Sequence, residues 1–132
     1  LLAAFTSLSA HAAELDVEVT GAHNTRGAVI CGLFDRAETF RKVGMQIAEA
    51  RSAISGGKAR CRFTGLAPGR YAVAAFHAEN GETEPSYGLF GKPRQGVAFT
   101  NNPSITFGPP RFDEAAINVG PDFTTVMITL RY

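Results

Sequence analysis

The feature that most constrains the fold of this chain is a series of short apolar or alternating runs, each bounded by glycine or proline. In residues 58–64, KARCRFT, basic side chains alternate with apolar ones, which is typical of a strand with one buried face. Residues 27–34, GAVICGLF, are almost continuously apolar, which favours a strand covered on both faces. Short strands separated by turn residues predict an all-β protein, specifically a single β-sandwich. We expect about seven strands, at residues 14–20, 27–34, 46–54, 58–64, 70–77, 115–119 and 123–131.

The chain has 132 residues, of which 45% are hydrophobic, enough for one domain with its own core over residues 13–132. Its net charge of +1 excludes an electrostatic hold on nucleic acid or anionic lipid, because those partners need a concentrated basic field. Residues 78–113 form a segment far longer than the usual hairpin loop of about 2 to 5 residues. We expect one long ordered loop there, which either carries function or is held by its own packing.

Residues 1–12, LLAAFTSLSAHA, contain no charged residue and end in small residues. This pattern resembles the second half of a secretory signal, with cleavage between Ala12 and Ala13; the alternative is a short buried apolar segment. We interpret residues 1–12 as a residual signal peptide, which places the mature protein in the periplasm or outside the cell. No segment of the sequence reaches the roughly 20 apolar residues of a bilayer span, so we expect no membrane span.

The chain has two cysteines, Cys31 and Cys61. In an exported protein they are candidates for a disulfide, because a disulfide persists in an oxidising compartment. The alternative is two buried thiols that act as small apolar core residues. The sequence leaves both interpretations open.

Several motifs together resemble one bacterial family. They are GAVICGLFD at 27–35, LAPGRYAVAAFHAENG at 66–81, GKP at 91–93 with Gly96, FTNN at 99–102, and FGPPRF at 107–112 followed by Ala115 and Ala116. On these motifs the chain is similar to the exported bacterial DUF2141 family, a domain of unknown function. The resemblance implies an immunoglobulin-like or transthyretin-like sandwich, and it implies no established activity.

Members of that family carry an acidic loop of the form D-E-N-G-N-G-K-x-D, which resembles a calcium loop. Here the stretch reads AENGETEPS, so Ala78 and Ser86 stand where the pattern has its first and last acids. Calcium takes about six to eight oxygen ligands. The alternative to a weak calcium site is a solvated acidic hairpin tip, and no other cofactor is expected. The remaining metal candidates are Glu79, Asn80, Glu82 and Glu84.

His77 closes a predicted buried strand, and Glu79 follows it closely enough to partner a histidine that acts as a general base. The sequence has no G-x-S-x-G motif to supply a nucleophile. Transthyretin-like hydrolases end in Tyr-Arg-Gly-Ser, whereas this sequence ends Leu130-Arg131-Tyr132. A hydrolase using His77 is therefore an alternative hypothesis, beside a structural histidine at a strand end.

The long segment also carries aromatic and amide side chains. Exposed rings stack on sugars or peptides, and amides donate and accept hydrogen bonds, so a ligand surface is one interpretation. The other is a satellite core, for which we expect Phe107 and Phe112 to pack inward and Tyr87 to stay exposed. We predict a non-catalytic binding or envelope accessory module whose partner is a small molecule, a glycan or a protein. Its candidate ligand residues are Tyr87, Phe90, Phe99, Asn101, Asn102 and His77.

Overall fold

The structure is a computed structural model that describes residues 12–86 and 93–132. Over these residues the chain forms eight strands and one short helix, α1 (Phe112–Ala115). The prediction of an all-β protein is confirmed. None of the described helical segments has the length and apolar composition needed to cross a bilayer. The strands are β1 (Ala13–Thr20), β2 (Ala28–Phe34), β3 (Ala48–Ser52), β4 (Ala59–Leu66), β5 (Gly69–Ala78), β6 (Val97–Phe99), β7 (Ile117–Val119) and β8 (Phe123–Thr129).

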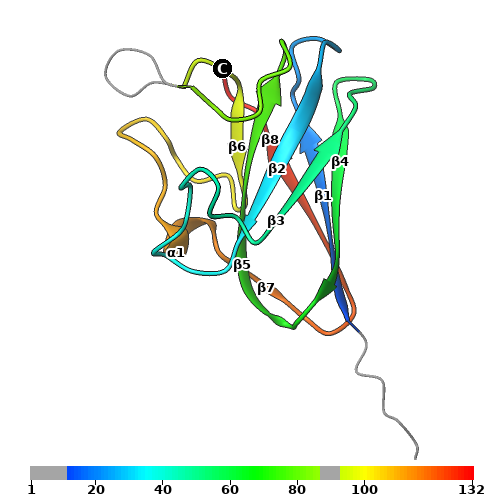
Figure 1. Cartoon of the computed structure of the whole chain (residues 1–132), viewed down its shortest axis with the longest axis vertical. Helices are drawn as coiled ribbons and strands as arrows, with labels where there is room; N and C mark the ends of the chain where they lie inside the picture. The colour runs from blue at the N-terminus through cyan, green and yellow to red at the C-terminus, as the bar shows by residue number, and fades with distance from the viewer. Residues whose placement is uncertain (1–11, 87–92) are drawn as a thin grey trace, which may run out of the picture.

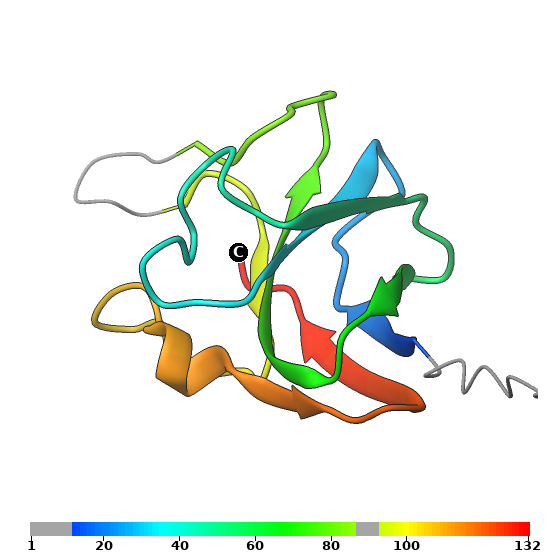
Figure 2. The ribbon, with the colours of Figure 1, turned by 60° about the horizontal axis from the view of Figure 1, so that its bottom comes forward.

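The strands form two sheets, which Figures 1 and 2 show as separate layers. The three-stranded sheet has the order β4-β1-β8, with β1 antiparallel to β4 and parallel to β8. The five-stranded sheet has the order β3-β2-β5-β6, and β7 pairs with the first residues of β5. All pairs within this second sheet are antiparallel. Beyond β8, Arg131 exchanges two backbone hydrogen bonds with Val97, which ties the sheets together beside β6.

The main core lies between the two sheets, because alternate residues of strands from both sheets point toward one another. The largest fully buried apolar side chains come from β1, β2, β5 and β8. They are Leu15, Val17, Val19, Val29, Leu33, Val73 and Ile128. This alternation is the pattern that the sequence predicted for residues 58–64, which form β4, and it makes one hydrophobic interior for the domain.

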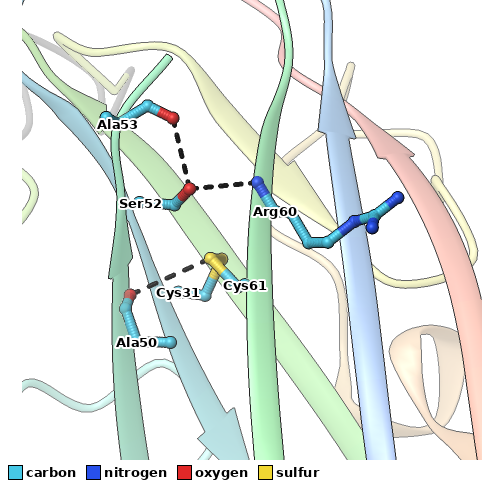
Figure 3. The surroundings of a disulfide bond; sticks show 6 residues. All are labelled: Cys31, Ala50, Ser52, Ala53, Arg60 and Cys61. Carbon is cyan, nitrogen blue, oxygen red and sulfur yellow. Dashed lines mark hydrogen bonds between the residues drawn. A yellow bond between two sulfur atoms is a disulfide. The ribbon is translucent and has the colours of Figure 1, made fainter. Parts of the chain in front are cut away.

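A disulfide joins the sheets through this core. Of the two alternatives for the cysteines, the structure has the bond: Cys31 of β2 and Cys61 of β4 are linked, with 6.4 Å between their Cα atoms. Figure 3 shows the link beside the edges of β3 and β4, where the backbone N–H of Arg60 donates to the hydroxyl of Ser52 over 3.1 Å. One covalent link and one polar contact therefore hold the two sheets together along this side.

Two elements differ from the sequence expectation, and both lie near the long segment. Strand β6 lies inside the expected loop, paired with residues 74–76 of β5, and it is too short for a periodic pattern to reveal it. Residues expected to begin a strand near 115 instead complete α1. Its first turn is closed by the carboxylate of Glu114, which accepts from the backbone N–H of Arg111 over 3.0 Å.

Candidate functional site

The outer face of the five-stranded sheet is apolar, and this face holds the candidate site. On β2, Cys31 and its alternate neighbours face the core, so Ile30, Gly32 and Phe34 face outward. Side chains of β5 and β6 continue this second apolar surface, with Phe76 and Val97 packed beside Ile30. The sequence of β2 is therefore continuously apolar because loops and sheet cover both of its faces, as predicted.

A hollow opens in this face because two very small residues stand side by side in the middle of it. Gly32 pairs with Ala74, and Ala74 pairs with Phe99, so one row of residues across the sheet has very short side chains at its centre. The next row consists of Ile30, Phe76 and Val97, which all have large side chains. The step between a row of large side chains and a row of small ones makes the floor of a pocket, with an enclosed volume of about 80 Å³.

Two loops supply the walls of this pocket, which we call the sheet-face hollow. It is lined by β2, β5 and β6 below, by residues 41–44 and Gln46 of the β2–β3 connection, by Glu49 of β3, and by residues 83–85. The backbone of Arg41 has a left-handed φ of 63°, a conformation that costs free energy for a side-chain-bearing residue and is often found at functional sites. Figure 2 shows the β2–β3 connection running beside the outer face of the sheet.

Charged groups of both signs reach the walls of the hollow. Arg41 and Lys42 contribute positive charge, and Glu49 and Glu84 contribute negative charge. The carboxylate of Glu49 accepts a hydrogen bond from the side-chain amide of Gln46 over 2.9 Å. This bond fixes the carboxylate at the β3 end of the row that contains Gly32 and Ala74. The hollow can therefore take an apolar group on its floor and polar groups at its mouth.

The predicted ligand residues fall in different places. Phe99 lies on the floor of the hollow. Tyr87 and Phe90 lie outside the described residues. The small residues that create the hollow, Gly32 and Ala74, were not among the predicted site residues. Gly32 has a weak signal in the sequence, a glycine inside an apolar strand, whereas Ala74 is one of several alanines in β5 and becomes notable only through its pairing with Gly32.

Asn101 and Asn102 fasten the long segment to the sheets. Both have a left-handed backbone, which asparagine tolerates better than most residues. The amide of Asn101 donates to the carbonyl oxygen of Ala116 over 2.9 Å. Beside them Thr100 is buried; its hydroxyl accepts from the backbone N–H of Val73 over 3.1 Å and donates to the carbonyl of Ala115. These hydrogen bonds hold the residues that follow β6 against β5 and against the end of α1.

His77 is fully buried at the end of β5, and both of its ring nitrogens have partners. Nε2 lies 2.8 Å from the carbonyl oxygen of Arg26, so Nε2 must carry the proton and donate. In the neutral ring Nδ1 then accepts from the hydroxyl of Tyr132, 2.7 Å away. The ring of Tyr132 stacks on that of His23, with 3.4 Å between centroids.

The carboxylate of Glu79 is engaged elsewhere than on the His77 ring. It accepts from the amide of Asn24 over 2.6 Å and from the guanidinium of Arg26 over 3.0 Å. These two hydrogen bonds, the Asn24 bond first, lower the pKa of Glu79 below its ordinary value. His77 and Glu79, which the alternative hypothesis joined as a general-base pair, each have other hydrogen-bond partners in the structure.

The other calcium candidates also contact the protein. Glu82 accepts from the side-chain amide of Gln95 over 3.0 Å and from the backbone N–H of Asn80 over 2.6 Å, and these bonds lower its pKa. Glu84 lines the hollow. Among residues 12–86 and 93–132, no three His, Cys, Asp or Glu side chains form a group that could hold a metal ion.

The fold and the hollow define an all-β protein of two sheets with a pocket on the outer face of the larger sheet. The chain belongs to the family described as "Uncharacterized protein conserved in bacteria (DUF2141)", whose model matches residues 17–127. This confirms the family that the sequence motifs indicated. Comparison with curated proteins and with solved structures gave no match.

Proposed function

We propose that this protein is a non-catalytic binding module, exported from the bacterial cell, that captures an apolar group of its ligand in the sheet-face hollow. The observation that carries the proposal is the pairing of Gly32 with Ala74 beside a row of large side chains, Ile30, Phe76 and Val97. A sheet that only needed to be covered would fill this position, because close packing stabilises a protein and a gap forgoes contacts. The gap is instead framed by two loops with charged side chains at its mouth.

The two sheets form an immunoglobulin-like or transthyretin-like sandwich. The start of β5 supports this assignment: the hydroxyl of Tyr71 donates back to the carbonyl of Ala67, four residues earlier. Such a contact matches the tyrosine corner of immunoglobulin-like domains, in which a tyrosine near a strand start bonds to backbone a few residues upstream. The disulfide between Cys31 and Cys61 and the signal-like residues 1–12 support export to the periplasm or beyond.

The contacts of His77 count against a hydrolase that uses it as a general base. A general base needs a nitrogen free to take a proton from a nucleophile or water. Here the two nitrogens of the buried ring face the carbonyl of Arg26 and the hydroxyl of Tyr132. Both contacts fix β5 against the β1–β2 loop and the segment after β8, which is a structural role.

Binding in the hollow is driven by removal of apolar surface from water, and the size of the hollow limits what enters. An enclosed volume of about 80 Å³ is smaller than the roughly 150 Å³ of a cavity that holds benzene. A ligand therefore inserts an edge of a ring or the end of a branched alkyl group, and the rest lies across the mouth. There Arg41, Lys42 and Glu49 meet its polar groups.

The proposal is tested by titration with N-phenyl-1-naphthylamine, an uncharged aromatic probe that fluoresces in apolar surroundings. Ala74→Leu places three further carbons in the hollow and is expected to weaken probe binding at least about 10-fold, since a side-chain-sized apolar contact is worth that much. Gly32→Ala is a milder filling variant, because it adds one carbon; the Phe34 ring must shift slightly, since the new Cβ would lie 3.3 Å from it.

Thr125→Leu is the matched control, because Thr125 is exposed on β8 in the other sheet. It adds similar bulk away from the hollow and is expected to leave probe binding unchanged. Thermal unfolding of each variant verifies that it folds. Equal probe binding by wild type and Ala74→Leu, or no binding by the folded wild-type protein, would overturn the proposed site.

A further inference from the structure

Phe107 is the most exposed large apolar residue in the described chain, with a relative exposure of 102%. It lies in a tight turn in which the backbone N–H of Gly108 donates to the carbonyl of Ile105 over 3.3 Å. The hydroxyl of Ser104 also donates to that of Thr106, inside the same turn. Pro109 and Pro110 follow and restrict the backbone further. The turn therefore presents the ring to solvent in a defined position.

Both ends of this turn are anchored on the domain. On one side Ile105 packs against the cluster of Ile30, Phe76 and Val97, the same side chains that line the sheet-face hollow. On the other side Pro110 is buried, and α1 begins shortly after it. The turn and the β2–β3 connection lie side by side in both ribbon views (Figures 1 and 2). Phe107 is thus a projecting ring beside an apolar hollow on one side of the molecule.

Burial of the Phe107 ring would be favourable, and a single chain does not bury it. A phenylalanine gains when its side chain leaves water, and a rigid, preorganised aromatic side chain is typical of residues that dominate an interface. No charged residue lies in residues 103–110, so burying this turn desolvates no ionic group. What fits Phe107 is an apolar recess of matching chemistry, and the hollow floored by Phe76 and Phe99 is one.

We propose that two copies of this chain associate by inserting Phe107 of each copy into the sheet-face hollow of the other. The Phe107 ring and the hollow lie beside each other on one side of the molecule, so both copies can use the same surface. Such an interface has two-fold symmetry and forms a closed dimer. The enclosed volume admits the ring edge first, with Val43 on the wall against its outer part. The inference rests on the proposed function, since the inserted ring occupies the ligand site, and a bound ligand therefore favours the monomer.

Sedimentation equilibrium of the mature chain over about 1 to 500 µM, a range suited to a small interface, tests the inference. Wild type is expected to shift from monomer to dimer across this range. Phe107→Ser is expected to weaken association at least about 100-fold, because each dimer loses two partly buried rings, and to stay monomeric. Phe123→Ser is the control, because Phe123 is exposed on β8, on the opposite sheet, and it should dimerise as wild type does.

Probe binding separates this inference from the proposed function. Phe107→Ser should bind N-phenyl-1-naphthylamine as well as wild type at low protein concentration and better at high concentration, because nothing competes for the hollow. Ala74→Leu should lose both the dimer and the probe. A wild-type protein that binds the probe but stays monomeric would overturn the dimer and leave the proposed function intact. A dimer that survives in Phe107→Ser or in Ala74→Leu would overturn the reciprocal insertion.

Discussion

Phe107 and Phe112 lie in the same segment, five positions apart, and replacing Phe112 by alanine is expected to destabilise the protein strongly, whereas replacing Phe107 should leave stability almost unchanged. Phe112 is buried, with 8% of its surface exposed, in a cluster with Phe34, Phe40 and Ala72. Its ring meets that of Phe40 edge to face, with 5.8 Å between centroids. The ring of Phe107 has no burial to lose within one chain. The two substitutions therefore remove the same atoms from opposite environments.

The magnitudes follow from that burial. A buried phenylalanine replaced by alanine costs about 3 to 5 kcal/mol. We expect Phe112→Ala to cost about 3 kcal/mol, at the low end, because its cluster lies under surface loops that can partly collapse into the gap. Part of this loss is the aromatic pair with Phe40, worth about 1 kcal/mol beyond area alone. Phe107→Ala should change the free energy of unfolding by less than about 0.5 kcal/mol, as surface substitutions do.

Urea unfolding of both variants, followed by circular dichroism at about 1 µM protein, where we expect the monomer, measures the two values. A loss of about 3 kcal/mol corresponds to a fall in Tm of about 10 °C for a domain of this size. Unchanged m-values would show that the denatured states are comparable. Equal losses in the two variants, or a larger loss for Phe107→Ala, would refute the assignment of the two rings to core and surface.

Three further predictions concern the core and the acidic loop. Removing the bond between Cys31 and Cys61, 30 residues apart, should lower stability by about 3.6 kcal/mol in the loop-entropy model; free thiols in the denatured, unreduced protein would contradict the bond itself. Because hydrogen bonds lower the pKa of Glu79 and Glu82, their contribution is present above the unfolded value of about 4.5 and is lost as pH falls through the folded values. Glu79→Gln should reduce the loss of unfolding free energy between neutral and acid pH, as measured by urea unfolding at each pH. An unchanged pH dependence would contradict the role assigned to Glu79. Calcium at about 1 mM should leave Tm unchanged relative to chelator, since both carboxylates already accept protein hydrogen bonds; a clear rise would establish a calcium site by mass action.

The sequence predicted the strands well where one period dominates. The alternation around Cys61 and the apolar run of β2 identified β4 and β2 because burial of one or both faces leaves a direct mark on composition. Strand β6 was not predicted, because a run of three residues is too short to show an alternating pattern. Only its pairing with β5 defines it as a strand. Pairing is a long-range property, and a local pattern does not contain it.

The site was harder to predict, for a related reason. Phe112 was correctly expected to pack, but the expectation for Phe107 was wrong: its ring points into solvent. The two residues belong to one short motif, FGPPRF at 107–112, and the turn closed by Gly108 decides which way Phe107 faces. The hollow depends on Gly32 and Ala74 being neighbours across two strands. A small residue in one strand is unremarkable until the register places a second one beside it.

The contact of Asn102 with β8 bears on how this protein avoids aggregation. β8 is an edge of its sheet, and an open edge presents N–H and C=O groups that can recruit a strand from another chain. The side chain of Asn102 accepts from the backbone N–H of Thr129 over 2.9 Å and donates to the carbonyl of Met127 over 3.4 Å. One carboxamide thus takes the place of a neighbouring strand. The last part of the edge is closed to intermolecular pairing, and growth of a continuous sheet from that end is blocked by a single side chain.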